Sequence, residues 1–308
     1  MFIKPSLLAG AVLLTASQSA NAIVINFDYS YDGGFFSGSN SSRRQILDAA
    51  GGFLGSILTD SLAAITSGGG NNFSAVFQRP DTGAETVLSG FSVAADTLTV
   101  FVGGQDMAAG NLGYGGFGGY QVSGTLDFST TAAQRGQASP SFGASATDFA
   151  PWGGLLAFSN SANWYFDDDL STTETFSGND FYSVVLHELG HVLGLGSSDS
   201  WMNKTSGTGF TGANAVAVYG GNVPLTGDRS HWQEGTQSTV NGLPQETLMD
   251  PTIRVGTRKL YTELDLAALK DVGWEVSVTA VPVPSAVWFF GTALFGFIAS
   301  QRKHNVSA

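Results

Sequence analysis

The chain has 308 residues, with 13 Lys and Arg against 25 Asp and Glu, and its formal net charge of −12 provides no basic excess for nucleic-acid binding. It contains no cysteine, so a disulfide framework, a thiolate metal site and a thiol nucleophile are excluded. A hydrophobic fraction of 43% is too high for a disordered chain, and the length suffices for one large domain with a substantial core.

The first 22 residues have the organisation of a secretory signal. Lys4 supplies one positive charge, residues 7–14 form a short apolar run, and small residues follow as far as Ala22. The apolar run is too short to span a membrane as a permanent anchor. We therefore expect export, with cleavage after Ala22.

The body of the chain, residues 23–276, predicts a mixture of strands and helices. Apolar and turn-forming residues predict strands at 23–27, 95–103, 155–158 and 164–166, a first helix within 42–60, and a loop over 107–119. Asn179 or Asp180 is expected to cap a helix over 181–193, which Gly194 ends. A last amphipathic helix follows Thr262 and stops at Gly273.

His187, Glu188 and His191 form an HExxH sequence on the helix predicted over 181–193. Residues four apart lie on one helical face, so both imidazoles can bind one zinc ion, while Glu188 can reach a water bound to it. Zinc lowers the pKa of such a water toward neutrality, and a carboxylate can accept its proton.

A catalytic zinc site needs a third protein ligand. Of the four histidines, His304 lies in the C-terminal tail, so His231 is the remaining candidate. Two alternatives are that His231 is only a packed side chain beside Trp232, and that Asp199 completes the site.

The sequence from His187 to Gly194, HExxHxxG, resembles the metzincin zinc metalloproteases. Most of them place the third ligand three residues later, where this chain has Ser197. His231 lies 40 residues after His191, which fits the long insertion of the leishmanolysin-like members. Met249, 18 residues after His231, resembles the methionine of the turn beneath the zinc. The resemblance implies Zn²⁺ as cofactor, Glu188 as general base and a protein or peptide as substrate.

Further segments resemble the matrixins. Residues 153–158 look like the strand that edges their substrate cleft, and Asp167, Asp168 and Asp169 look like their calcium-binding loop, although a solvated loop is the simpler alternative. Residues 260–274 are similar to the closing helix of bacterial matrixin-like proteases. In some metzincins a tyrosine approaches the metal. Tyr261 and Tyr219 are candidates for this role, but their spacing from the histidines does not match that of such a tyrosine.

These resemblances imply an α+β, zincin or metzincin-like domain over residues 23–276. A twisted mixed sheet with a backing helix would precede the active-site helix, which would cross the cleft floor. A smaller C-terminal subdomain would hold His231, Met249 and the last helix.

The C-terminal segment, residues 281–304, has the pattern of a membrane-targeting tail. Pro282 and Pro284 precede an uncharged, aromatic-rich run, and Arg302 and Lys303 follow it. The stretch is just long enough to span the hydrocarbon layer, with basic residues on its inner flank. A simple tail anchor is one explanation. The segment also resembles the PEP-CTERM sorting signal that an exosortase processes in exopolysaccharide-producing bacteria, although Val283 stands where that signal usually has Glu.

Together these features predict an exported bacterial zinc endopeptidase, held at the cell surface, outer membrane or extracellular matrix, or secreted after removal of the tail. Two alternatives stay open. One is a non-catalytic, zinc-containing surface or exopolysaccharide-matrix protein, in which Glu188 would be dispensable. The other is a zinc amidase acting on cell-wall peptides. No nucleic-acid partner is expected.

Overall fold

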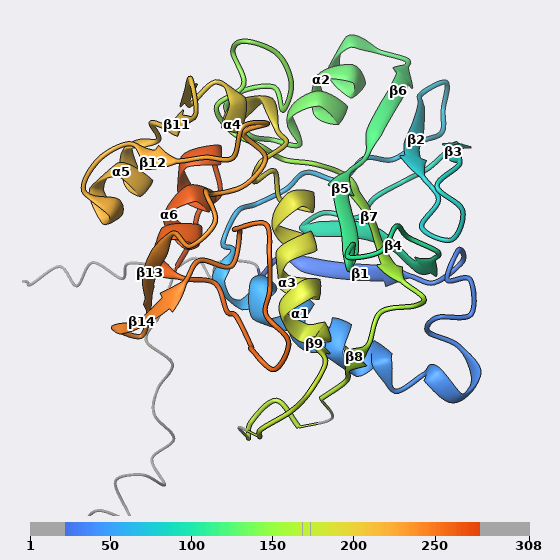
Figure 1. Cartoon of the computed structure of the whole chain (residues 1–308). Coiled ribbons are helices and arrows are strands. Elements are labelled where there is room, and N and C mark those ends of the chain that lie inside the picture. Colours follow the sequence, from blue (N-terminus) through green and yellow to red (C-terminus); the bar gives the residue numbers. More distant parts are fainter. Residues whose placement is uncertain (1–21, 168, 173, 278–308) are drawn as a thin grey trace, which may run out of the picture.

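The computed structural model describes residues 22–167, 169–172 and 174–277, which form a mixed α+β structure (Figure 1). The predicted signal segment up to residue 21, the predicted sorting segment and Asp168 lie outside the described residues. Across the described ranges, no helix is both long and apolar enough to cross a membrane.

A four-stranded mixed sheet forms the centre of the fold. Its order is β1 (Val24–Asp28), β4 (Thr97–Gln105), β7 (Gly153–Ser159) and β5 (Gly113–Phe117). The strands β1, β4 and β7 are parallel to one another, whereas β5 is antiparallel to β7. Every residue of β7 is buried, as expected for a strand covered on both faces.

The strand order of this sheet contradicts two predictions made from the sequence. The prediction that residues 153–158 edge the cleft is wrong, because β7 lies between β4 and β5. The prediction of a loop throughout 107–119 is wrong for Gly113–Phe117, which form the edge strand β5, and for Gly119, which begins the strand β6 (Gly119–Ser123). Glycine is normally depleted in strands. Here it is required, because a Cβ at Gly115 would overlap the carbonyl oxygen of Glu188.

A second, three-stranded sheet covers one face of the central sheet. It has the order β3 (Glu85–Ser89), β2 (Asn72–Gln78), β6 (Gly119–Ser123), and the helix α2 (Leu126–Gln134) follows it. Phe77 of β2 stacks on Phe101 of β4 with ring centroids 4.2 Å apart. These rings belong to a buried cluster between the two sheets.

Two helices lie on the opposite face of the central sheet and belong to the larger buried core. The backing helix α1 (Arg43–Ile57), preceded by the short helix η1 (Gly38–Asn40), packs against β1 and α3. The active-site helix α3 (Phe181–Val192) packs against β5 and β7. The strands β8 (Trp164–Tyr165) and β9 (Asn179–Asp180) pair immediately before α3.

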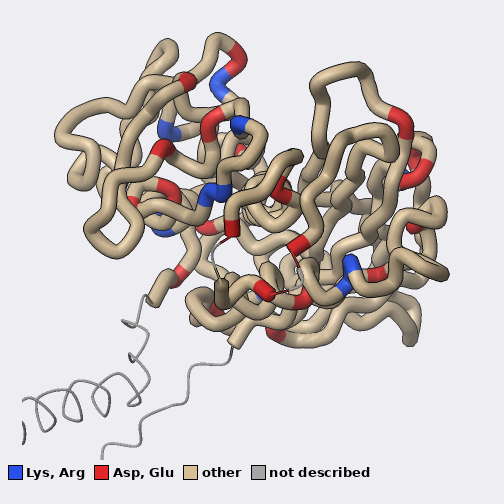
Figure 2. Tube along the Cα trace, turned by 60° about the horizontal axis from the view of Figure 1, so that its bottom comes forward, with Lys and Arg blue, Asp and Glu red and all other residues tan. Residues whose placement is uncertain are grey.

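The residues after α3 form a smaller part of the molecule, built from short elements around one longer helix (Figure 1). The elements are α4 (Asp199–Met202), β10 (Thr205–Ser206), β11 (Gly209–Phe210), α5 (Ala213–Tyr219), β12 (Val223–Pro224), β13 (Gln237–Val240), β14 (Leu243–Glu246) and α6 (Glu263–Val272). Acidic positions are spread over this part and the sheet-containing part alike (Figure 2).

Candidate metal centre and cleft

The helix α3 carries the HExxH residues and begins at a well-anchored cap. The Asp180 carboxylate accepts hydrogen bonds from the backbone N–H and the hydroxyl of Ser183. Arg258 donates to both oxygens of the same carboxylate, at 3.0 and 2.8 Å. This buried cap fixes the start of α3 and therefore the direction in which its later side chains point.

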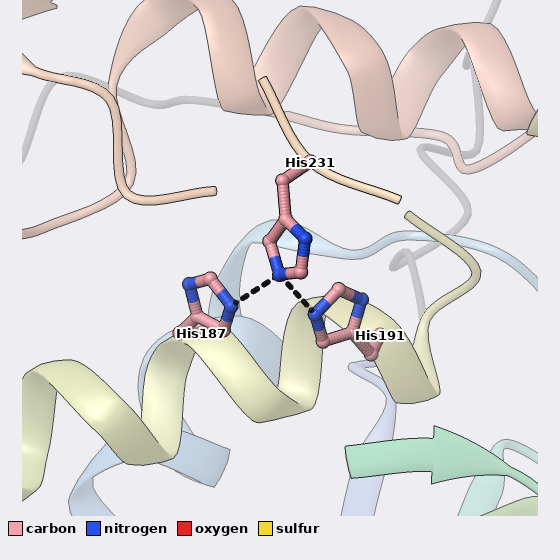
Figure 3. A group of neighbouring side chains, drawn as sticks. All are labelled: His187, His191 and His231. Atoms are coloured by element: carbon pink, nitrogen blue, oxygen red, sulfur yellow. Dashed lines mark hydrogen bonds between the residues drawn. The ribbon is translucent and has the colours of Figure 1, made fainter. Parts of the chain in front are cut away.

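Three imidazoles converge above α3 (Figure 3). His187 and His191 project from one face of the helix, and His231 approaches from the segment between β12 and β13. The Nε2 atom of His231 lies 3.2 Å from that of His187 and 3.1 Å from that of His191. The structure thus brings together the three histidines that the sequence singled out.

The outer nitrogen of each ring has its own partner. The Nδ1 atoms of His187 and His191 donate to the backbone carbonyls of Leu248 and Leu195, at 2.8 and 2.9 Å. Because a carbonyl only accepts, both rings carry their proton on Nδ1, which leaves a lone pair on each Nε2 atom.

The third ring is oriented by a side-chain relay. The Ser230 hydroxyl donates to Asp228 at 2.9 Å, so it can accept the Nδ1 proton of His231 at 2.7 Å. The three inward-facing Nε2 atoms then present lone pairs to one another, an arrangement that is repulsive unless a cation lies between them. Their spacing suits zinc, since tetrahedral Zn–N bonds of about 2.0–2.1 Å place neighbouring nitrogens about 3.3 Å apart.

The electrostatics of the site keep the imidazoles neutral. Burial, together with the neighbouring rings, lowers the pKa of His187 well below its usual value and that of His191 to about 4. Burial also lowers the pKa of His231, although Asp228 opposes this. Neutral imidazole is the form that binds metal ions.

Glu188 lies beside the histidines at the floor of the cleft. The side chain is buried, which raises the pKa of its carboxyl group to about 8, and a backbone hydrogen bond from Gly115 partly offsets this rise. A cation at the three imidazoles would favour the ionised carboxylate and lower this pKa again.

The segment that leaves α3 is shaped by two glycines with positive φ. Gly194 has φ +97°, a left-handed conformation that ends the helix as the sequence predicts. Gly196 has φ +73°, and a Cβ there would overlap the carbonyl oxygen of Ser230. The absence of a side chain at Gly196 therefore lets the residues before His231 approach the end of α3.

Met249 and Tyr261 contact α3 at Gly190, and neither side chain lines the cleft. Both pack against Gly190, where an added Cβ would meet the Met249 sulfur and the Tyr261 hydroxyl. Met249 is buried, as the methionine-turn resemblance implies. The Tyr261 hydroxyl donates to the carbonyl of Leu186 at 3.0 Å and is buried in the core.

Other sequence candidates lie elsewhere. Asp199 accepts a hydrogen bond from the backbone of Gly143 and is not one of the side chains that converge at the metal centre. Ser197 borders the cleft and donates to the carbonyl of His191. Tyr219 is exposed on α5, where it lines a separate hollow beside β13.

The acidic loop does not support the calcium expectation. Asp167 pairs at 2.7 Å with Arg258, which also pairs with Asp180, so its carboxylate is engaged in an ion pair with this guanidinium. Asp169 binds the hydroxyl and backbone N–H of Ser171. Within the described part of the chain, neither residue belongs to a group of side chains close enough to share an ion.

The histidines open into a cleft of about 940 Å³. One wall is the edge strand β5 with the residues before it, and the facing wall comes from the segments around His231 and residues 248–253. The sequence did not predict that β5 is part of the site. The alternation of glycines at 113 and 115 is the one signal of its close contact with α3.

These features define a mixed α+β protein with a three-histidine centre and a buried glutamate in an open cleft. The matrixin family profile matches residues 125–206, which include His187, Glu188 and His191 but end before His231 and Met249. The match supports a zinc metallopeptidase of metzincin type. No curated protein and no solved structure matches the chain.

Proposed function

We propose that this protein is an exported zinc-dependent endopeptidase. The observation that carries the proposal is the convergence of three neutral imidazoles beside a buried carboxylate in an open cleft, with the Nε2 atom of His231 3.2 and 3.1 Å from those of His187 and His191. The partial matrixin match supports the same conclusion.

The roles of the side chains follow from their positions. Zinc held by His187, His191 and His231 would polarise the scissile carbonyl and make water a stronger acid. Glu188 is the group positioned to accept a proton from the attacking water and to deliver it to the leaving amine. Its carboxyl group has a high pKa in the protein alone, so binding of zinc would prepare it to act as a base.

The substrate would bind in an extended conformation along β5. This strand pairs with β7 on one side only, and its residues line the cleft next to Glu188. An extended peptide can add to such an edge through main-chain hydrogen bonds. That mode of binding favours unfolded segments or loops as substrates.

The cellular location of the protein is proposed from the sequence alone. We propose that residues 1–22 direct export, and that residues 281–304 hold the protein at a bacterial membrane until an exosortase-type enzyme processes them. These proposals rest on the charge and hydropathy patterns of the two ends.

The test compares hydrolysis of a quenched-peptide and denatured-protein panel by the wild type and by Glu188→Gln. We expect zinc-dependent turnover by the wild type and a loss of kcat of at least about 100-fold in the variant. The variant should retain its zinc, because Glu188 is not a ligand.

Glu85→Gln, an identical change at an exposed position on β3, is the matched control and should be fully active. A zinc-loaded wild type that cleaves nothing in the panel would favour the non-catalytic surface protein. A folded protein that binds no zinc would overturn the proposal.

A further inference from the structure

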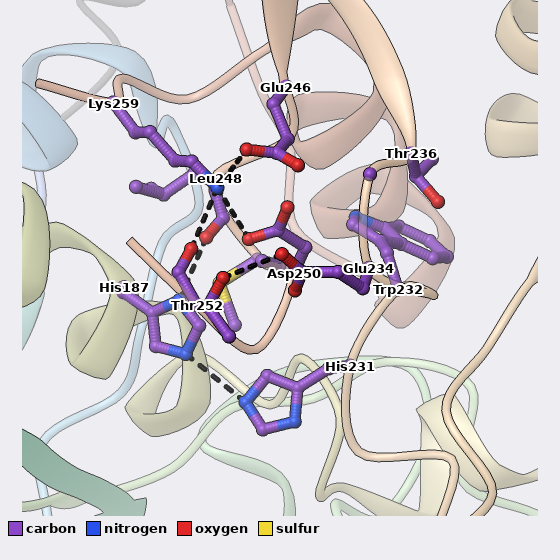
Figure 4. Close-up of polar contacts among 12 residues, drawn as sticks. His187, His231, Trp232, Glu234, Thr236, Glu246, Leu248, Asp250, Thr252 and Lys259 are labelled. Carbon is purple, nitrogen blue, oxygen red and sulfur yellow. Dashed lines mark hydrogen bonds and ion pairs between the residues drawn. The ribbon is translucent and has the colours of Figure 1, made fainter. Parts of the chain in front are cut away.

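A second group of metal-compatible side chains, apart from the three histidines, lies at the cleft wall formed by residues 248–253. Glu234, Glu246 and Asp250 bring carboxylate oxygens within 4.8 Å of one another. They come from three different segments: the residues after His231, the end of β14 and the turn that contains Met249. Figure 4 shows the three carboxylates gathered at one point.

One cation of the protein already contacts this group. The buried ammonium of Lys259 lies 2.9 Å from Glu246 and 2.6 Å from Asp250, and it also donates to the carbonyl of Thr252 at 2.8 Å. The guanidinium of Arg254 also lies near enough to lower the pKa of Glu246, so two positive charges face three carboxylates. Lys259 and Arg254 therefore do not fully neutralise the group.

Asp250 provides the independent indication of a ligand. Its side chain is 1% exposed, and while Oδ1 binds Lys259, Oδ2 has no hydrogen-bond partner among the described residues. Leaving a buried carboxylate oxygen unpaired is costly. Burial, with the charges of Glu246 and Glu234, raises the pKa of Asp250 to about 7, so the surroundings of this oxygen favour added positive charge.

The group is open to solvent on one side. Glu234 is exposed, and its Oε1 atom accepts a hydrogen bond from the Thr252 hydroxyl at 2.7 Å, which holds the carboxylate beside the other two. The exposed side gives an ion a route of entry and leaves room for water ligands.

We propose that Glu234, Glu246 and Asp250 bind a hard divalent cation of the calcium class. Carboxylate and water oxygens are the ligands that such ions prefer. The ion would join the chain after His231 to the hairpin β13–β14 and to the turn that contains Met249. It would thereby brace the third imidazole and the cleft wall formed by residues 248–253.

The experiment measures binding rather than catalysis, so its outcome is independent of the proposed peptidase activity. Full-length zinc-loaded protein is titrated with Ca²⁺ and followed by thermal unfolding, and with Tb³⁺ followed by tryptophan-sensitised emission. Trp232, two residues before Glu234 in the chain, serves as the sensitiser. We expect Ca²⁺ to raise the Tm in a saturable manner and to displace Tb³⁺.

Glu234→Gln is the decisive variant, because the residue is exposed and its replacement leaves the contacts of Lys259 intact. We expect its Ca²⁺ affinity to fall at least tenfold, whereas the matched control Glu85→Gln should bind Ca²⁺ as the wild type does. The proposal is overturned if Ca²⁺ leaves the wild-type Tm unchanged. It is equally overturned if Glu234→Gln binds Ca²⁺ normally, since the ion would then occupy another site.

Discussion

At the scale of single residues, the distance between the edge strand and the active-site helix depends on Gly115. A Cβ at this position would overlap the backbone of Glu188, whereas at Gly116 it would approach nothing closer than the Tyr114 hydroxyl, at 3.6 Å. We expect Gly115→Ala to lower kcat/KM on a quenched peptide by about 100-fold, because a displacement on the order of 1 Å is that costly at a reacting centre. Gly116→Ala is the control and should stay within a few-fold of the wild type, with zinc content measured in both. Full activity of Gly115→Ala would show that β5 does not position Glu188.

Asp228 is expected to act on the metal through Ser230 and His231. Its carboxylate accepts hydrogen bonds from Thr226 and from both the hydroxyl and the backbone N–H of Ser230, and these lower its pKa to about 2. Loss of such an outer partner typically weakens metal binding about 10- to 100-fold. We expect Asp228→Asn to show a weakening of this size in a chelator competition, and exposed Asp127→Asn to show none. Equal zinc affinity in the two variants would contradict the relay.

The residues differ in how far the sequence alone could identify them. His187, Glu188 and His191 follow from helical spacing, and His231 from the small number of histidines. Asp228 and Gly115 could not be found in this way, because their roles depend on contacts with residues that only the folded chain brings near.

At the scale of helices and strands, local chemistry predicted the elements that have strong caps. The helix α6 begins at a capping box between Thr262 and Asp265, and α3 begins at Asp180, both as expected. The helices α2 and α5 were missed because both are short, at nine and seven residues, and α5 has no side-chain cap. The strand β5 was missed because glycine has a low strand propensity. Its glycines are required by a tertiary contact, the close approach of α3.

The contact between Asp60 and the C-terminal end of the described chain is expected to make the stability of the fold depend on pH. Asp60 lies beyond α1, and both of its carboxylate oxygens accept a hydrogen bond from the backbone N–H of Glu275, which joins the C-terminal end of the described chain to the first helix. Burial raises the pKa of Asp60 from 3.8 to about 6, and these backbone hydrogen bonds only partly oppose the rise. The folded state therefore holds this proton more tightly than the unfolded state does. The contribution of Asp60 to stability is present below pH 4 and is lost as the pH rises to about 6.

The Asp60→Asn variant removes this titration. The difference in free energy of unfolding, variant minus wild type, should rise by about 3 kcal/mol between pH 3.5 and pH 7. Urea unfolding at several pH values measures it, with Asp127→Asn as an exposed control whose difference should stay small. A difference for Asp60→Asn that does not change with pH would show that Asp60 titrates normally.

At the scale of the whole molecule, the candidate metal centre connects two parts that the chain forms separately. His187 and His191 belong to α3 beneath the central sheet, whereas His231 belongs to the smaller part that follows. The smaller part has its own organising carboxylate, since buried Asp265 accepts hydrogen bonds from Trp232 and from the backbone of Leu248. Its fold was predicted only in outline, because its short elements are defined by such buried polar contacts rather than by periodicity.

Zinc should therefore stabilise the whole fold as well as take part in catalysis. A ligand that binds only the folded state at a thousandfold excess over its Kd adds about 4 kcal/mol of stability. We expect a strong chelator to lower the Tm of the wild type and of Glu188→Gln by the same amount, since neither lacks a ligand. His231→Ala should start from a lower Tm and respond weakly to the chelator. Differential scanning calorimetry with and without chelator measures these shifts. If His231→Ala lost as much stability on chelation as the wild type does, zinc would still bind fully without this imidazole, and His231 would not be the third ligand.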